Sequence, residues 1–272
     1  MRAGLIQLSS GPDPEANLAI TRGFLRDAAA AGANLVLTPE VTNIVTAERA
    51  HLAAMVHPEN SDPTLAALCD EAGRQGLWLL IGSLALRTDD PDGRFANRSF
   101  LVSPEGRIAA RYDKIHMFDV DLSQTERYRE SAAFRPGARA VMAETPIARI
   151  GLSICYDLRF PGLYRRLAQA GAEILTVPSA FTRETGKAHW ESLLRARAIE
   201  NGAFVLAPAQ TGENANGRAT HGHSLAVSPS GEVLADAGTE PCVTLVDFDL
   251  ASVDHARRRV PSLHHDREFL GP

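Results

Sequence analysis

The order of the predicted elements limits the possible folds most strongly, because it recurs in the two halves of the chain. Each half reads as strand, helix, strand, helix, strand and hairpin, with short apolar runs as strands and apolar residues at helical spacing as helices. The first half gives residues 5–8, 12–31, 34–38, 63–74, 77–84 and 97–112, and the second gives 147–154, 163–170, 174–178, 188–201, 204–207 and 221–235, with 242–248 closing the sheet. Two half-domains of the same plan can each bury one sheet face on the other. We therefore predict an α/β fold, a four-layer α-β-β-α sandwich formed by one domain of residues 1–272.

The composition is that of an ordinary globular protein, with 44% hydrophobic and 22% charged residues. A net charge of −5 offers no basic surface for nucleic acid, and no apolar run reaches the length of a membrane span. The three cysteines, Cys69, Cys155 and Cys242, are too few for a disulfide framework and favour a reducing compartment. The first strand begins at once and leaves no room for a signal peptide. We expect a cytoplasmic protein whose partner is a small molecule, without nucleic acid or membrane.

Cys155 lies at a predicted corner between a strand and a helix. Such a corner projects a side chain out of the sheet and leaves the following N–H groups unpaired, which favours a thiolate and any oxyanion formed beside it. A buried core residue is the alternative, because free cysteines often behave as small hydrophobes. Residues 151–155 also begin like the nucleophile elbow of serine hydrolases. Cys155 stands where that motif needs glycine, however, which argues against Ser153 as the nucleophile.

Two acids and a lysine stand out in the first half of the chain. Glu40 follows a predicted strand, at the carboxyl edge where open α/β sheets bind ligands. Lys114, His116 and Glu130 belong to the polar segment 111–137, for which we predict no regular element. Loops of this length inside a compact domain are usually functional. Solvated surface charges are the alternative reading for Glu40, Lys114 and His116.

Other chemistries have weaker signals. A cysteine–histidine pair with His189, His221 or His223 as the base is compatible with the spacing. The histidines lack companion ligands at the spacing of zinc sites, so we expect no metal and no cofactor. Residues 185–187 lack the earlier glycine of a phosphate loop, and 97–99 match a glycosylation acceptor that would have no role in a cytoplasmic protein.

Four motifs, in this order along the chain, resemble those of the nitrilase superfamily of carbon–nitrogen hydrolases. They are Pro39-Glu40 at a strand end, the run 112–119, Glu130-Ser131 before a Pro-Gly turn, and the run 151–161 around Cys155. The resemblance extends from residue 3 to about residue 266. Within the superfamily, the runs 155–161, 168–175, 178–181 and 189–200 look most like the deaminated glutathione amidase branch, with the ω-amidases nearby.

The resemblance implies a Glu-Lys-Cys triad at Glu40, Lys114 and Cys155, with the second glutamate of the superfamily at Glu130. The implied reaction hydrolyses a non-peptide C–N bond of a small acyl amide to carboxylate and ammonia, through a thioester on Cys155. Lys114 and the backbone N–H of Tyr156 would hold the oxyanion. One departure is visible at Gly162, where many relatives have glutamate.

The substrates that the resemblance implies, deaminated glutathione or an ω-amide such as α-ketoglutaramate, are anionic, so basic residues are expected in the pocket. The candidates for substrate binding are Arg159, Phe181, Arg183, Lys187 and His189, although Arg159 also suits a bracing role at the corner. Another aliphatic amidase or a nitrilase is the alternative within the superfamily. From another class, a non-catalytic binding protein on the same fold stays open.

A homodimer or higher homo-oligomer is also implied by the resemblance. Residues 249–272 form a basic tail of low periodicity, and a tail long enough to leave the core often packs on a neighbouring subunit. We therefore predict that this tail contacts the partner.

Overall fold

Two six-stranded sheets form the centre of the molecule in the computed structural model, which describes residues 1–123, 126–213 and 219–271. The first sheet contains, in spatial order, β16 (Cys242–Asp247), β1 (Arg2–Gln7), β2 (Leu35–Leu37), β3 (Trp78–Leu86), β4 (Ala96–Val102) and β5 (Ile108–Asp113). The second contains β15 (Val233–Asp236), β14 (Leu225–Val227), β11 (Phe204–Ala207), β10 (Ile174–Thr176), β9 (Arg149–Leu152) and β8 (Val141–Glu144). Two short ribbons pair β6 (Asp119–Asp121) with β7 (Arg127–Arg129), and β12 (Thr211–Glu213) with β13 (Ala219–His221).

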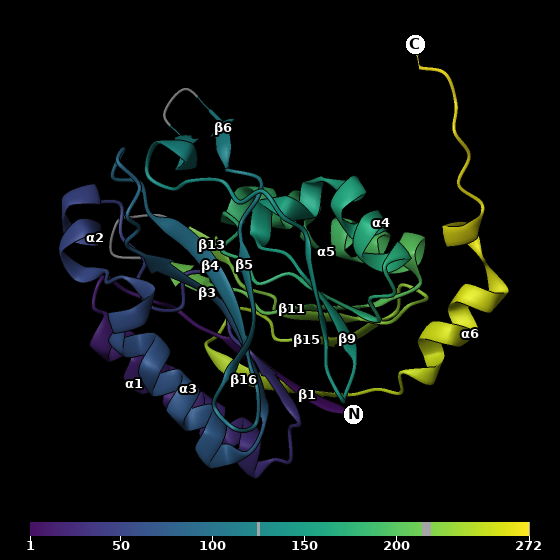
Figure 1. Cartoon of the computed structure of the whole chain (residues 1–272), viewed down its shortest axis with the longest axis horizontal. Coiled ribbons are helices and arrows are strands. Elements are labelled where there is room, and N and C mark those ends of the chain that lie inside the picture. Colours follow the sequence, from purple (N-terminus) through teal and green to yellow (C-terminus); the bar gives the residue numbers. More distant parts are fainter. Residues whose placement is uncertain (124–125, 214–218, 272) are drawn as a thin grey trace.

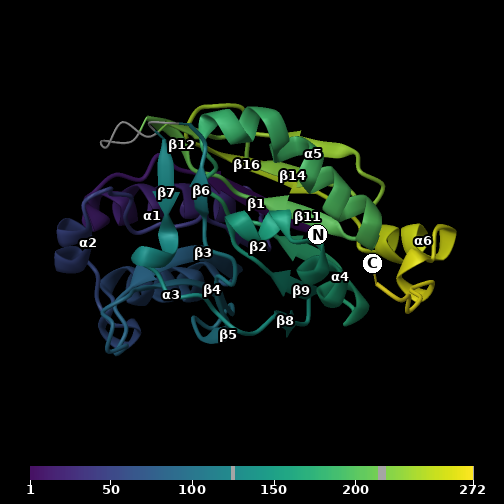
Figure 2. The ribbon, with the colours of Figure 1, turned by 90° about the horizontal axis from the view of Figure 1, so that it is seen from above.

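Helices cover the outer face of each sheet. The helices α1 (Pro14–Ala30) and α3 (Pro63–Gln75) pack on the first sheet, and α4 (Pro161–Gln169) and α5 (Arg183–Asn201) pack on the second (Figures 1 and 2). The predicted four-layer sandwich is therefore confirmed. Both α1 and α3 begin with an aspartate cap followed by proline, and the caps Asp13 and Asp62 accept backbone N–H bonds of the first turn. No helix in the described ranges combines the length and the apolar character needed to cross a membrane.

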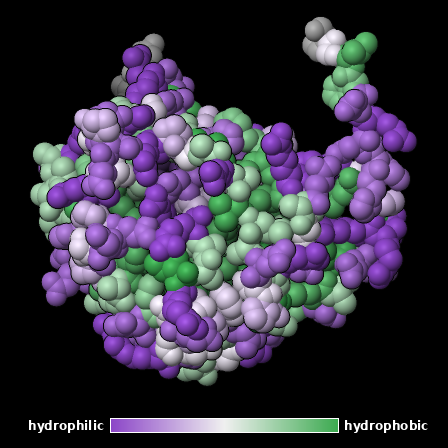
Figure 3. All heavy atoms as spheres, viewed as in Figure 1, coloured by the Kyte–Doolittle hydropathy of each residue, from purple (hydrophilic) through white to green (hydrophobic). Residues whose placement is uncertain are grey.

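The C-terminal segment is more regular than its sequence predicts, because it forms α6 (Ala251–Arg259) and a short 3-10 turn, Ser262–His264. It packs first on its own chain: Arg257 donates to the carbonyl oxygens of Ala172 and Asn201, and Arg165 pairs with Asp266. Beyond this contact the chain stands clear of the body (Figures 1 and 3), and Phe269 and Leu270 are exposed there. Contact of the tail with a partner subunit stays a prediction, and so does the homodimer.

The last strand lies in a different sheet from the one expected. Instead of closing the second sheet beside β15, β16 pairs antiparallel with β1 in the first sheet, from Arg2 opposite Asp247 to Gln7 opposite Cys242. The Gln7 amide donates to the carbonyl oxygens of Gly238 and Glu240, which fixes the connection that crosses between the sheets. Strand periodicity identifies a strand but not its neighbour, and this accounts for the difference.

Further elements were missed by the sequence patterns, including the β12–β13 ribbon. The others are α2 (Arg49–Met55), the edge strand β8, and the β6–β7 ribbon inside the segment 111–137, which was expected to have no regular element. The strands of the ribbon have three residues each, too few for a period-2 pattern to emerge.

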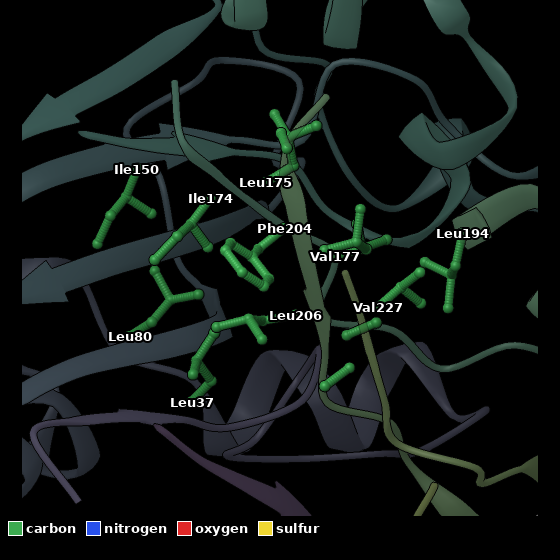
Figure 4. Close-up of a cluster of buried hydrophobic side chains, with 14 of the residues drawn as sticks. Leu37, Leu80, Ile150, Ile174, Leu175, Val177, Leu194, Phe204, Leu206 and Val227 are labelled. Atoms are coloured by element: carbon green, nitrogen blue, oxygen red, sulfur yellow. The ribbon is translucent and has the colours of Figure 1, made fainter. Parts of the chain in front are cut away.

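Alternating side chains of the strands build two separate cores. On β2, Leu37 lies in the core between the sheets, whereas its neighbour Val36 lies in the core beneath α1 and α3. Figure 4 shows Leu37 and Leu80 of the first sheet beside Ile174 and Leu206 of the second. All of these side chains are fully buried. Burial of apolar surface stabilises the folded state by roughly 25 cal/mol per Å², so the packing of these side chains holds one sheet against the other.

Gly82 of β3 lies where the ends of β2 and β10 come close together. A Cβ atom at this position would lie 2.0 Å from the carbonyl oxygen of Thr38, 2.5 Å from that of Pro39 and 2.6 Å from Cβ of Pro178. Backbone oxygens cannot move aside as the end of a flexible side chain can, so only glycine fits. Because Gly82 has no side chain, the end of β2 in the first sheet can approach the end of β10 in the second. Glu40 lies at this point, since it follows Pro39 directly.

Replacing Gly82 by alanine is expected to lower the free energy of unfolding by about 3 kcal/mol or more, because the methyl group overlaps backbone atoms. Gly23 is the matched control: it is exposed in α1, and a Cβ atom added there would meet nothing within 4 Å. Gly23→Ala should raise the free energy of unfolding by about 0.5–1 kcal/mol through helix propensity. Urea unfolding followed by circular dichroism measures both changes, and a Gly82→Ala variant as stable as the parent would contradict the close approach.

Candidate active site

Three distant segments bring their side chains into one pocket of about 970 Å³. Glu40 follows β2, Lys114 follows β5, and Cys155 follows β9, and all three line the pocket together with Glu130. Each of the first three is at least nine-tenths buried. The side chains named from the sequence as a triad thus lie together on the pocket wall.

Lys114 is the centre of a buried ion cluster. Its Nζ donates to Oε1 of Glu40 at 2.8 Å, and to Oε1 and Oε2 of Glu130 at 2.9 and 2.8 Å. Burial alone would lower the pKa of Lys114, but the attraction of Glu130 and Glu40 outweighs it and raises this pKa well above its usual range. Lys114 therefore remains an ammonium ion in contact with both carboxylates.

Glu40 accepts hydrogen bonds from both sheets. Oε1 accepts from Lys114 and from Nδ2 of Asn97 at 2.9 Å, and Oε2 accepts from the backbone N–H of Ala180 at 2.9 Å. Burial raises the pKa of Glu40, but the charge of Lys114 and the hydrogen bonds of Lys114, Cys155 and Asn97 more than compensate, so the net pKa is lowered. Glu40 is therefore an ionised carboxylate placed to accept a proton.

Cys155 occupies a left-handed backbone conformation with φ of 48°, at the first residue of a 3-10 turn, Cys155–Arg159. This conformation is rare for a non-glycine residue and is held in part by a bond from its N–H to the Pro178 carbonyl, 2.9 Å long. The next N–H, that of Tyr156, has no hydrogen-bond acceptor among the described residues. The corner therefore presents a sulfur atom and an unpaired N–H donor from adjacent residues.

The resting protonation state of Cys155 differs from the sequence expectation. Burial and the negative charge of Glu40 raise the pKa of the thiol, and Lys114 offsets only part of this effect. The expectation that the corner favours a thiolate is therefore wrong for the resting site. At neutral pH the pocket therefore holds a thiol beside a carboxylate that can accept its proton.

Asp157, which the sequence did not single out, ties the corner to the strand that carries Lys114. Its carboxylate accepts from the Tyr112 hydroxyl at 2.7 Å, from the backbone N–H of His116 at 3.0 Å and from that of Ile154 at 2.9 Å. The His116 ring also contacts it, with Nδ1 at 2.7 Å. Four contacts to one fully buried carboxylate fix β5 against the turn of Cys155.

The alternatives drawn from the sequence are not brought together by the fold. His221 stacks on His223, His223 pairs with Asp236, and both lie with His189 along a separate pocket of about 360 Å³. Among the described residues, no histidine lines the pocket of Cys155. Ser153 is buried and bonded to the Tyr164 hydroxyl and the Thr176 carbonyl. The described part of the chain holds no cluster of three or more residues suited to a metal ion.

The residues predicted to bind substrate divide into two groups. Phe181, Arg183 and Lys187 line the pocket. Arg159 and His189 do not: the Arg159 guanidinium lies over the Phe181 ring at 5.4 Å, with Nη2 3.3 Å from Nδ1 of His189. Arg159 therefore has the bracing geometry that was its alternative role.

Several further lining residues come from the segment 118–130 and from β4. They are Asn97, Phe118, Arg127, Tyr128 and Arg129. The density of ionisable and aromatic residues marked that segment as functional, but nothing in the sequence indicated Asn97. Gly162 lies exposed at the start of α4, where a Cβ atom would meet nothing within 4 Å, so its lack of a side chain leaves no gap.

Comparison with known proteins places this geometry in a known class. A deaminated glutathione amidase from Yersinia enterocolitica is 39% identical over 264 residues, 97% of this chain and 92% of that protein. The structure of Saccharomyces cerevisiae Nit3, a member of branch 10 of the nitrilase superfamily, matches with a TM-score of 0.84 and 28% identity over 96% of this chain and 94% of that chain. The fold and the sequence together therefore define an enzyme of the nitrilase superfamily.

The family model for carbon-nitrogen hydrolases matches residues 2–258, and the chain belongs to this family. A glutamate-to-glutamine mutant of the amidase from Nesterenkonia sp. AN1 also matches, with a TM-score of 0.79 and 28% identity over 97% of this chain and 98% of that chain. That structure shows the product of Michael addition of acrylamide at the active-site cysteine.

The raised pKa of Cys155 gives a direct test of the resting state. We expect the ultraviolet absorbance of its thiolate to appear only above about pH 9, later than for an ordinary cysteine of pKa about 8.5. Cys155→Ser supplies the background from Cys69 and Cys242. Glu40→Gln removes the adjacent negative charge and should lower the pKa of the thiol. Ionisation below pH 7 in the parent protein would instead indicate a preformed thiolate ion pair.

Proposed function

We propose that this protein hydrolyses a small anionic amide through a thioester on Cys155, with Glu40 as the base and Lys114 as the oxyanion donor. The observation that carries the proposal is that Glu40, hydrogen-bonded to Lys114, and the buried Cys155 thiol lie together on the wall of one pocket. A non-catalytic binding protein would have no need to bury two carboxylates and an ammonium ion beside a thiol, because burying charges is costly.

The first half of the reaction forms the thioester. Glu40 takes the thiol proton as the sulfur attacks the amide carbonyl, and the oxyanion is held by Lys114 and by the unpaired N–H of Tyr156. Glu40 then gives the proton to the amide nitrogen, the C–N bond breaks, and the amine leaves. For a primary amide this amine is ammonia.

The second half releases the acid. Glu40 takes a proton from water as the water oxygen attacks the thioester carbonyl, the C–S bond breaks, and the sulfur of Cys155 recovers a proton. Glu130 holds Lys114 in place through its two oxygens, and is itself fixed by the N–H of Phe118 at 2.7 Å. Each half thus returns the site to a thiol beside a carboxylate.

We propose deaminated glutathione as the substrate, following the name of the Yersinia relative. The amide nitrogen of this compound carries the rest of the peptide, so its leaving group is an amine much larger than the ammonia that the sequence resemblance led us to expect. A pocket of about 970 Å³ is near the upper end of the roughly 300–1,000 Å³ usual for drug-sized ligands. This volume favours an amide with a large substituent over a compact ω-amide such as α-ketoglutaramate.

The cations around the pocket differ in how far they are already neutralised. Arg183 lies 3.4 Å from Glu213, and Arg127 and Arg129 lie 3.6 and 2.7 Å from Asp121. Lys187 forms no ion pair within the described ranges. We therefore propose Lys187 as the main contact for a substrate carboxylate, with Arg183 secondary.

Loss of the sulfur tests the proposed reaction. Cys155→Ala and Cys155→Ser should abolish hydrolysis of deaminated glutathione, and Glu40→Gln should lower kcat by at least about 10³-fold, because the base is lost for both halves of the reaction. Product release is measured by chromatography. His223→Ala is the control and should retain activity. Full activity of the Cys155→Ala variant would refute the thioester.

Lys187→Ala should raise KM for the anionic substrate about tenfold with little change in kcat, because one charge-assisted contact is lost in both ground and transition states. Arg183 is already paired with Glu213, so Arg183→Ala should raise KM less than Lys187→Ala does. A neutral amide analogue provides the control, and its KM should be the same for parent and variant. An equal rise in KM for the neutral analogue would argue against a carboxylate contact.

A further inference from the structure

Asn97 is buried beside the proposed catalytic groups, although its sequence context matched only a glycosylation acceptor. It lies on β4 and is 2% exposed, so its amide is not available for glycan attachment in the folded protein. Its Nδ2 donates to Oε1 of Glu40 at 2.9 Å and to Oε1 of Glu130 at 3.3 Å. One neutral side chain thus bridges the two carboxylates that share Lys114.

The backbone of Asn97 contributes to the same cluster. Its carbonyl oxygen accepts from the backbone N–H of Lys114 at 3.0 Å, which fixes the residue from which the ammonium side chain extends. The neighbouring side chain, Arg98, points the other way and pairs with Asp113 and Glu59. Alternation along β4 therefore turns Asn97 toward the pocket and Arg98 away from it.

The acceptor atom of the Asn97 amide indicates that this side chain is not there to stabilise the fold. Oδ1 is buried and has no hydrogen-bond partner among the described residues. A buried polar atom without a partner costs free energy, and such exceptions in native proteins call for an explanation. The donor side supplies one here, because Nδ2 meets two anions that a single ammonium ion cannot fully neutralise.

We propose that Asn97 is a positioning residue that holds Glu40 and Glu130 apart and keeps Glu40 oriented toward the Cys155 thiol. This inference rests on the proposed function and adds a residue to it. A neutral double donor is suited to the role, since a third carboxylate would repel the other two and a second cation would compete with Lys114. The groups that face Glu40 are then Lys114, Glu130, Cys155, Asn97 and the N–H of Ala180.

The inference predicts a change in the pH dependence of catalysis. The Asn97 hydrogen bond lowers the pKa of Glu40, so its loss raises that pKa, and Glu40 then becomes protonated at higher pH. The base must be ionised, and the acid limb of the kcat/KM profile should therefore move to higher pH, by about one pH unit in Asn97→Asp. We also expect kcat to fall at least about tenfold in Asn97→Asp and Asn97→Ser, with KM nearly unchanged.

Ser99→Ala is the matched control. Ser99 lies two residues further along β4 and is equally buried, and its hydroxyl donates to the carbonyl oxygen of Ile81. Its variant should keep the kcat and the acid limb of the parent. If Asn97→Asp does not fold, Asn97→Ser, which is smaller and neutral, carries the same test by thermal unfolding and kinetics.

Three results would overturn the inference: unchanged kcat and acid limb in a folded Asn97 variant, a change in KM alone, or equal effects in Ser99→Ala. The proposed function fails separately, since it requires loss of activity in Cys155→Ala whatever Asn97 does. The rate of Cys155 alkylation by iodoacetamide gives a readout that needs no turnover. Its pH dependence should differ between Asn97→Ser and the parent, because Glu40 titrates differently beside the thiol.

Discussion

The ammonium group of Lys114, held between Glu40 and Glu130, is the interaction on which the site depends. An ammonium ion without partners would not stay charged at this depth, and two carboxylates this close would not both stay ionised without a cation. The cluster still carries one net negative charge, which the N–H groups of Ala180 and Phe118 help to stabilise. Each group thus helps to fix the charge state of the others.

This mutual dependence explains why the raised pKa of Cys155 is consistent with its proposed role as nucleophile. A preformed thiolate would add a third anion beside Glu40 and Glu130. A neutral thiol avoids this repulsion, and an ionised Glu40 is available to take its proton only as the sulfur attacks. Asp157 holds the corner in register with Lys114 from a position that does not line the pocket, where its carboxylate accepts from Tyr112, His116 and the N–H of Ile154.

The sequence predicted the elements and the residue types better than their partners. Strand and helix periods located the parts of both halves, and four motifs named Glu40, Lys114, Glu130 and Cys155, whose catalytic roles stay predictions. The sequence could not predict which sheet contains β16, because periodicity carries no information on the neighbouring strand. Asn97 was missed for a related reason. The role of an asparagine in a strand depends on the groups that it faces, and here these are Glu40 and Glu130, 57 and 33 residues away in the sequence.

The two sheets contribute different parts of the site, since Glu40 and Lys114 extend from the first and Cys155 from the second. The bond from the N–H of Ala180 to Glu40 is a polar link that crosses between them at this point. The contacts of Asp157 with Tyr112 and His116 are further polar links, and the apolar layer around Leu37 and Leu206 holds the rest of the two sheets together. A substitution deep in that layer can shift Glu40 and Lys114 relative to Cys155 without touching the pocket. Core substitutions that accumulate during evolution would then alter the proposed activity as well as the stability.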